Sequence, residues 1–193
     1  MRTLLFTILI SHFLLLDAQN KLLDTRDSNE YNTVQIGNMI WMAENLNYNA
    51  GEGAVCYNNT DSNCVKYGRL YVWEVALKSC PSGWHLPTDE EWKKLEVIIG
   101  MDSSLTDIVG TRGNNEGISL NEGGNSGFEA LFGGYRLWWD KSYHYLDHYG
   151  DYWAATEDSK EEAWYRNFSK YDPAVYRNRI NKKYAYSVRC VKD

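Results

Sequence analysis

Two short stretches of the sequence hold most of the residues that could carry out chemistry. The first, CPSGWHLPTDEEWKKL at residues 80–95, places His85 close to three consecutive acidic residues, 89–91. A histidine beside a carboxylate is a common arrangement for general acid–base catalysis. Consecutive acids on a helix point in different directions, however, so these three cannot act as a catalytic pair. A tryptophan and a leucine flank His85, and this apolar setting predicts a packed histidine with one hydrogen bond.

The same acidic residues have a simpler explanation as the start of a helix. Thr88 and Glu91 have the spacing of a capping box, in which a hydroxyl and a carboxylate satisfy the first free N–H groups of the helix. The two acids between them would lie in the first turn, where the helix dipole favours negative charge. Apolar residues then recur at helical spacing as far as Gly100, so we predict a helix over residues 88–99.

The second stretch is WWDKSYHYLDHYGDYW, residues 138–153, which is rich in histidine, aspartate and aromatic residues. His144 and His148 have the spacing that would place two imidazoles on one face of a helix, as in some zinc sites. The aromatic neighbours and Gly150 instead favour a strand or a loop, in which that spacing has no such meaning. We therefore predict neither a metal ion nor another cofactor.

Other patterns typical of enzymes do not occur in the sequence. No serine lies in a nucleophile elbow and no glycine pattern fits a phosphate-binding loop. The prediction is a protein that is not an enzyme. The alternative is an enzyme of the cell envelope that pairs His85 or His144 with a nearby acid.

Residues 1–18 have the pattern of a secretory signal peptide. One basic residue precedes an apolar run from Leu4 to Leu16, and cleavage is expected after Ala18. The run is too short at its flanks for a stable membrane span. The sequence therefore predicts a secreted or cell-surface protein.

Export affects how the cysteines are interpreted. The chain has 4 cysteines, and an oxidising compartment favours disulfides over zinc. Of the three possible pairings we favour Cys56 with Cys64, which closes a short polar loop, and Cys80 with Cys190, which joins the first stretch to the end of the chain.

Composition narrows the possible ligands. The net charge of -6, without any run of basic residues, argues against nucleic acid as a partner. The chain has 8 Trp and 15 Tyr against 5 Phe. Tyrosine and tryptophan are favoured on binding surfaces because they bring large area with few rotors and can still hydrogen-bond.

The remaining chain reads as one domain that begins with a hairpin. Residues 19–32 are polar and predict a loosely held arm. Residues 33–48 predict a β-hairpin with a turn at Gly37 and Asn38. Residues 68–79 have the spacing of a short helix, whereas residues 101–127 are rich in Gly, Asn and Ser and predict a long loop. From Phe128 onward, four or five alternating runs predict a mostly antiparallel sheet.

Six ordered blocks resemble the Fibrobacter succinogenes major paralogous domain. They are VQIGNMIWMAENLNY, YGRLYVWEVA, CPSGWHLPTDEEW, GGYR, DYWAATED and YSVRCVKD, and the likeness covers residues 33–193. This family looks related to the C-type lectin-like fold, so the resemblance implies an α+β domain of two helices and twisted antiparallel sheets. It also implies an exported bacterial surface or adhesion module. The calcium- and sugar-binding triplets of true C-type lectins are missing, so calcium-dependent sugar binding is not implied.

The last part of the chain also resembles the variable proteins of diversity-generating retroelements, which are rich in Tyr, Asn and Ser before a similar ending. The alternative is an ordinary polar sheet. We expect a polysaccharide or protein ligand on an aromatic, Asn-rich face, and the sequence leaves the oligomeric state open. The candidate binding residues are Trp138, Trp139, Tyr143, Tyr145, Trp164, Tyr165, Asn167, Tyr171, Tyr176 and Asn178.

Overall fold

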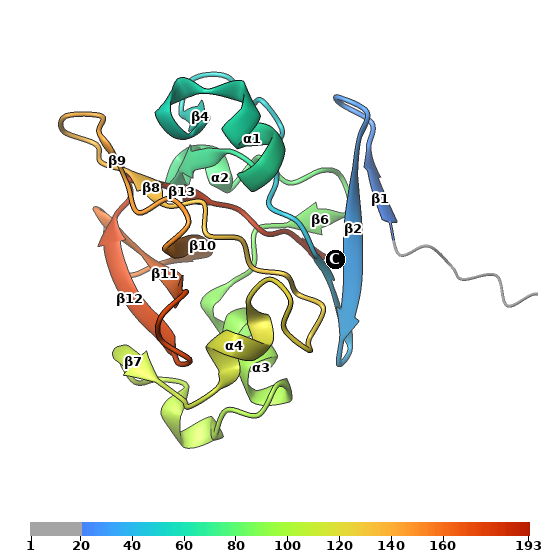
Figure 1. Ribbon diagram of the computed structural model, residues 1–193, viewed down its shortest axis with the longest axis vertical. Coiled ribbons are helices and arrows are strands. Elements are labelled where there is room, and N and C mark those ends of the chain that lie inside the picture. The colour runs from blue at the N-terminus through green and yellow to red at the C-terminus, as the bar shows by residue number, and fades with distance from the viewer. Residues whose placement is uncertain (1–20) are drawn as a thin grey trace, which may run out of the picture.

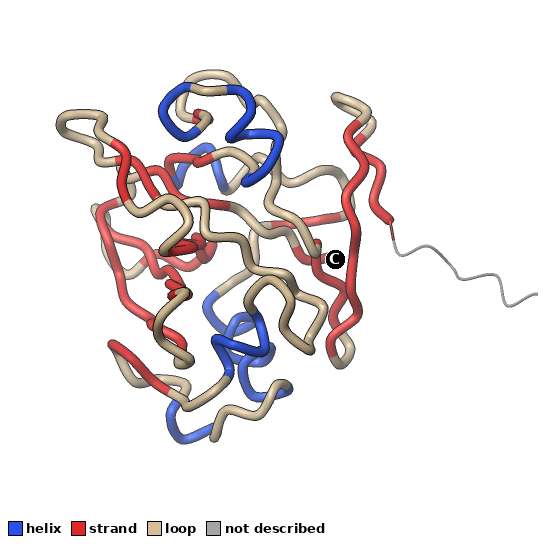
Figure 2. Tube along the Cα trace, viewed as in Figure 1, coloured by secondary structure: helices blue, strands red, loops and turns tan. Residues whose placement is uncertain are grey.

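The computed structural model describes residues 21–193, so the predicted signal peptide lies outside the described residues. The fold is mixed α+β, with two sheets and a few short helices (Figures 1 and 2). The C-terminal end of the chain returns to lie beside the first strands (Figure 1). No helix within the described part of the chain is both long enough and apolar enough to cross a membrane.

The smaller sheet holds both ends of the domain. Its strands run in the order β1-β2-β3-β14-β6. The predicted hairpin is confirmed as β2 and β3, joined at Gly37, whose φ of 62° suits glycine. The bounds are β1 Lys21–Asp24, β2 Asn29–Ile36, β3 Met39–Met42, β6 Trp84–His85 and β14 Val191–Lys192.

The expected loose arm differs from the structure, because residues 21–32 form β1 and the first half of β2. The two strands pair antiparallel from Lys21 with Asn32 to Asp24 with Asn29. The buried carboxylate of Asp24 also binds Arg26, whose guanidinium donates to the carbonyl of Ser79 at 2.7 Å. The polar residues of this segment therefore serve two contacts, the pairing of β1 with β2 and the hydrogen bond to the loop before β6. They do not indicate a mobile arm.

The larger sheet forms the body of the second half. Its main path is β4-β5-β13-β10-β11-β12-β7, and β8 and β9 branch from β13. The bounds are β4 Ala54–Val55, β5 Leu70–Val72, β7 Gly110–Arg112, β8 Tyr135–Arg136, β9 Tyr143–His144, β10 Tyr149–Glu157, β11 Glu162–Ser169, β12 Val175–Asn181 and β13 Ala185–Ser187.

The helix predicted over residues 88–99 is confirmed as α3, Asp89–Ile98. The hydroxyl of Thr88 accepts the N–H of Glu91, and the Glu91 carboxylate accepts the N–H of Thr88 at 2.8 Å, so the capping box is complete. Trp92 and Leu95, both on this helix, are fully buried. The remaining helices are α1 Asp61–Tyr67, α2 Trp73–Ala76, α4 Glu116–Leu120 and the short 3-10 turns Tyr57–Asn59 and Ser103–Leu105.

Two sequence-based expectations of secondary structure were wrong. Residues 68–79 are not one helix, because β5 pairs with β4 and β13 and only the four residues of α2 are helical. The expected loop over residues 101–127 holds β7 and α4. In both segments a strand forms because it pairs with a distant strand, β13 for β5 and β12 for β7. A local sequence pattern does not identify that distant partner.

The disulfide pairings are as expected. Cys56 bonds Cys64, and Cys80 bonds Cys190. The second disulfide ties the segment before β6 to the segment before β14 across 110 residues of sequence. Disulfides of this kind are typical of proteins outside the cytoplasm.

A buried network of charges fastens α3 to the larger sheet. Asp89 contacts Arg166 and Arg177 at 2.7 Å each, and Glu96 contacts Arg112 and Arg166 at 2.6 Å each. Burial alone would raise the pKa of Asp89, but hydrogen bonds from Arg177 and the charge of Arg166 outweigh it and hold that pKa well below its usual range. The network therefore joins the helix to β7, β11 and β12.

Removing one acid from this network should destabilise the whole domain. Because Glu96→Ala leaves two buried guanidinium groups without their shared carboxylate, we expect the free energy of unfolding to fall by about 3–5 kcal/mol. Urea unfolding of the purified protein measures this. Glu90→Ala is the matched control, because Glu90 lies on the same helix with its side chain 71% exposed and should change stability by about 0.5 kcal/mol or less. Equal effects of the two substitutions would contradict a structural role for the network.

Candidate functional site

Strand alternation places the polar aromatic residues of the larger sheet on one face. Along β11, Tyr165 and Asn167 point to this face, whereas Arg166 points to α3 on the other. The register aligns Asn167 with Asp151 on β10 and with Tyr176 on β12. Side chains far apart in the sequence thus form one row across three strands.

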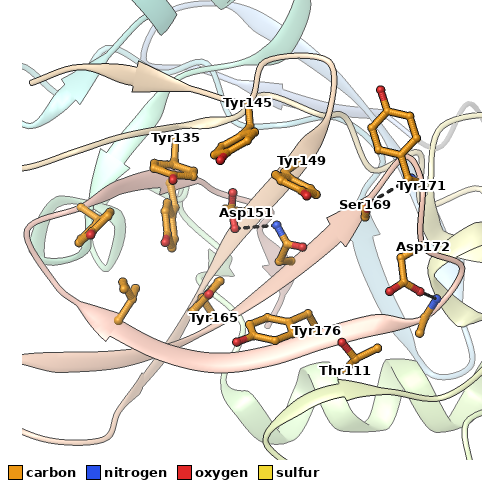
Figure 3. Close-up of a pocket in the computed structure, with 15 residues that line it drawn as sticks. Thr111, Tyr135, Tyr145, Tyr149, Asp151, Tyr165, Ser169, Tyr171, Asp172 and Tyr176 are labelled. Carbon is orange, nitrogen blue, oxygen red and sulfur yellow. Dashed lines mark hydrogen bonds between the residues drawn. The ribbon is translucent and has the colours of Figure 1, made fainter.

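This face is hollowed into a cavity of about 530 Å³, which we call the tyrosine cavity. Figure 3 shows the side chains around it, with Tyr135, Tyr145 and Tyr149 on one side of Asp151 and Tyr165 and Tyr176 on the other. Its wall contains 8 tyrosines and, among the described residues that form it, no lysine, arginine or histidine. The lining residues are Thr111, Tyr135, Tyr145, Tyr149, Asp151, Tyr165, Asn167, Ser169, Tyr171, Asp172, Ala174, Tyr176, Ile180, Tyr184 and Tyr186.

Two glycines bring the β8–β9 hairpin close to the sheet, and this hairpin carries part of the wall. Gly134 has a φ of 60° and donates its N–H to the carbonyl of Tyr149 on β10 at 2.8 Å, and a Cβ there would clash with the carbonyl oxygen of His144 in β9. A Cβ at Gly150 would lie 2.6 Å from the carbonyl oxygen of Leu131. Only glycine permits this approach, which sets Tyr135 and Tyr145 beside β10.

Tyr145 is held in an unusual backbone conformation at the rim of the cavity. Its φ is 62°, in the left-handed region that bulky residues rarely adopt. Its ring packs on Tyr149 with centroids 4.9 Å apart, yet half of the residue remains exposed. Strained residues of this kind are held by their surroundings and concentrate at functional sites.

Asp151 lies at the floor of the cavity and is only 3% exposed. Its Oδ1 accepts a hydrogen bond from Nδ2 of Asn167 at 2.9 Å (Figure 3), and its Oδ2 has no partner among residues 21–193. Burial disfavours the charged carboxylate, and the hydrogen bond from Asn167 compensates only in part, so the pKa of Asp151 is raised to about 7.

Three of the tyrosines near Asp151, namely Tyr135, Tyr165 and Tyr186, remain neutral. Burial, reinforced by the charge of Asp151, raises the pKa of Tyr135 to about 12. The same causes raise the pKa values of Tyr165 and Tyr186 further. The wall therefore offers phenol rings and hydroxyl groups, and the buried charge is confined to one carboxyl group.

The structure brings together half of the binding residues expected from the sequence and separates the others. Tyr145, Tyr165, Asn167, Tyr171 and Tyr176 line the tyrosine cavity. Asn178 donates to the hydroxyl of Tyr176 at 2.7 Å and so supports the wall.

The four other residues lie elsewhere. Trp138 lines a second cavity of about 800 Å³, and Trp139 is 55% exposed. Tyr143 packs on Tyr57 at the outer side of the hairpin. Trp164 is on the opposite face of β11, beneath the guanidinium of Arg177 at 3.6 Å, because neighbouring residues of a strand point to opposite faces.

The expected surface, residues 135–149 and 164–181, includes Tyr135 and Tyr149, although neither was named as a binding residue, whereas Asp151, Tyr184 and Tyr186 lie outside it. The alternation of Tyr149 with Asp151 in the run YGDYW was a usable signal, since residues two apart share a face of a strand. Tyr186 lies on β13 and Tyr184 directly precedes it. Both join the cavity wall because β13 pairs in parallel with β10, a strand that is distant in the sequence.

His85 is not the packed residue with a single hydrogen bond that its neighbours suggested. Its Nε2 is 2.9 Å from Oε1 of Glu91 and its Nδ1 is 2.6 Å from Oδ1 of Asp193. Burial lowers the pKa of His85, but the hydrogen bonds to the two carboxylates outweigh burial and raise it overall. His85 lines neither the tyrosine cavity nor the second cavity.

His144 has a different environment. Its Nε2 is 2.8 Å from the hydroxyl of Ser142. Residues 21–193 contain no group of three or more histidine, cysteine, aspartate or glutamate side chains placed to hold a metal ion.

Removal of the buried charge at Asp151 should change how stability depends on pH. The folded-state pKa is about 7 against about 3.8 in the unfolded chain, so the native state loses stability as pH rises between these values. Asp151→Asn removes this loss, and we expect its free energy of unfolding relative to wild type to increase by about 2 kcal/mol between pH 5 and pH 8. Urea unfolding at the two pH values measures this difference.

Asp172→Asn serves as the control, because Asp172 is an exposed acid on the same cavity wall. Its stability should follow the wild-type pH dependence. Parallel curves for Asp151→Asn and wild type would show that Asp151 is not a buried, unpaired acid.

The comparisons with known proteins identify a family. The sequence model of the Fibrobacter succinogenes major domain matches residues 34–192, which is nearly all of the described chain. No curated protein and no solved structure matches the chain. The matched segment contains both disulfides, α3 and every residue of the tyrosine cavity. The chain therefore belongs to the Fibrobacter succinogenes major domain family.

Proposed function

We propose that this protein is a secreted or cell-surface binding module, without enzymatic activity, that takes a polysaccharide or protein ligand in the tyrosine cavity. The observation that carries the proposal is the composition of the wall, with 8 tyrosines around one buried acid on a disulfide-bonded scaffold. A cavity of about 530 Å³ is within the range of about 300–1,000 Å³ typical of ligand sites.

Tyrosine suits such a site for physical reasons. Its ring offers a large contact area at a small cost in side-chain entropy, and its hydroxyl can donate or accept a hydrogen bond. The hydroxyl groups of Tyr135, Tyr165 and Tyr186 form no hydrogen bond to another residue of the described chain, so they are available to a ligand. Strands β10, β11 and β12 carry Tyr149, Tyr165 and Tyr176 and hold these rings more rigidly than loops would.

The contacts of His85 support the proposal of a binding protein rather than an enzyme that uses His85 with a nearby acid. Glu91 is already engaged in the capping box of α3, and Asp193 directly follows β14. Together the three side chains join β6, α3 and the C-terminus. This arrangement accounts for His85 as a structural residue without a substrate.

The proposed C-type lectin-like fold and export agree with the arrangement of the chain ends. The last strand, β14, returns to pair with β3, and Cys190 just before it is bonded to Cys80. Both disulfides suit an oxidising compartment, as expected for an exported protein.

A second candidate is a variable binding protein of the kind made by diversity-generating retroelements. It is favoured by the meeting of Tyr165, Asn167, Tyr171 and Tyr176 on one cavity, because diversified positions must share a surface to alter binding. A reverse-transcriptase gene beside this one would support this candidate.

The proposal predicts that ligand binding depends on rings of the cavity wall. We expect Tyr145→Ser and Tyr176→Ser each to weaken binding about 30-fold, as removal of a central aromatic contact typically does. Binding is measured on arrays of glycans and of peptides, followed by titration of the strongest ligand. Tyr143→Ser is the matched control, since Tyr143 is on the same hairpin but outside the cavity. Retention of all array binding by the double variant Tyr145→Ser/Tyr176→Ser would refute the site.

A further inference from the structure

The charge of the tyrosine cavity restricts the chemistry of its ligand. Its charged wall residues are Asp151 and Asp172, and no basic side chain of the described chain lies on the wall. The faces of tyrosine rings carry negative electrostatic potential and attract cations. An anionic ligand would therefore be repelled, whereas a cationic group would be attracted by the carboxylates and by the rings.

Asp151 differs from every other buried acid of the described chain in its partners. Asp24 is paired with Arg26, Asp89 with Arg166 and Arg177, and Glu96 with Arg112 and Arg166.

Glu116 has no cation but accepts the backbone N–H groups of Asn114 and Asn115 through one oxygen. Asp151 has one neutral amide donor, from Asn167, and its Oδ2 has no protein partner within residues 21–193. A buried charge without a partner is costly, so this position suits a partner that arrives with the ligand.

Three tyrosine rings pack against one another on the cavity wall that also contains this carboxyl group. Tyr186 lies 5.9 Å from Tyr135 and 5.1 Å from Tyr165, measured between ring centroids. The ring planes are inclined by 70° and 50°, so the rings form separate walls rather than a stack. A cation within about 6 Å of several ring centroids gains from each of them.

We propose that the tyrosine cavity binds the primary ammonium group of a lysine side chain from a protein ligand, with the carboxylate of Asp151 accepting its hydrogen bond. This inference rests on the proposed binding function and names the ligand chemistry. The unpaired acceptor requires a donor, which a primary ammonium has and a quaternary ammonium lacks. Asp151 lies at the floor of an aromatic wall, so a long apolar stem is needed to reach it, as a lysine has.

Ionisation links the binding of lysine to pH. Asp151 faces Tyr135, Tyr165 and Tyr186 from the neighbouring strands, and Asn167 beside it is uncharged. Because the ammonium favours the ionised carboxyl group, affinity should be constant above pH 7 and fall about tenfold for each pH unit below it.

The test titrates the full protein with N-acetyl-L-lysine methylamide at pH 8 and follows the tyrosine ring signals by NMR. The matched probe is N-acetyl-norleucine methylamide, which has a linear alkyl side chain but no ammonium. We expect norleucine to bind at least about tenfold more weakly than lysine. Asp151→Asn should weaken lysine binding at least about tenfold at pH 8, leave norleucine binding unchanged, and differ little from wild type at pH 5.5.

Several results would overturn the inference. They are equal binding of lysine and norleucine, lysine binding that Asp151→Asn does not weaken, no saturable shift with lysine, or tighter Asp151-dependent binding of glucosamine, which would assign the cavity to an amino sugar. Array ligands that lack an ammonium group but still require Tyr145 and Tyr176 would refute only this inference. An absence of any tyrosine-dependent array binding would count against the proposed function itself.

Discussion

The buried ion pairs between α3 and the larger sheet are the interaction on which the other features of the domain depend. Arg166 and Arg177 project from adjacent strands and meet Asp89 at the start of the helix, while Glu96, two turns further along the same helix face, binds Arg166 and Arg112. Buried ion pairs allow little movement of the strands that carry them, because a buried charge without its partner would destabilise the fold by several kcal/mol. The network therefore fixes β7, β11 and β12 relative to one another and to α3.

The tyrosine cavity is the other side of the same strands. Arg166 of β11 and Arg177 of β12 point toward α3, and the residues that alternate with them, Tyr165, Asn167 and Tyr176, point to the cavity. One face is thus a closed interior in which acids and guanidinium groups pair, and the other is an open surface of tyrosine rings around an acid without a cation. The contrast between Asp89, held by two guanidinium groups, and Asp151, held by one amide, separates a structural acid from one that is available to a ligand.

Local patterns were sufficient to predict the features whose causes are local. The capping box at Thr88 and Glu91 and the turn at Gly37 needed only neighbouring residues, the pairing of four cysteines had few alternatives, and the α+β organisation was implied by the family resemblance. The candidate site was predicted in part, since Tyr145, Tyr165, Asn167, Tyr171 and Tyr176 share the cavity.

What the sequence did not reveal depends on register and on distant pairing. Trp164 was expected beside Tyr165, but adjacent strand residues face opposite ways. Asp151 was not named as a binding residue, and its neighbour in the fold, Asn167, is known only from the pairing of β10 with β11. The helix expected over residues 68–79 was wrong for the same reason, because Val72 of β5 pairs with Ala185 of β13, which is 113 residues further along the sequence.

The most direct test of this account is a pH titration of the Asp151 carboxyl carbon by NMR in the free protein. The account predicts a midpoint near pH 7, and a midpoint near 4, the ordinary value for an aspartate, would contradict it.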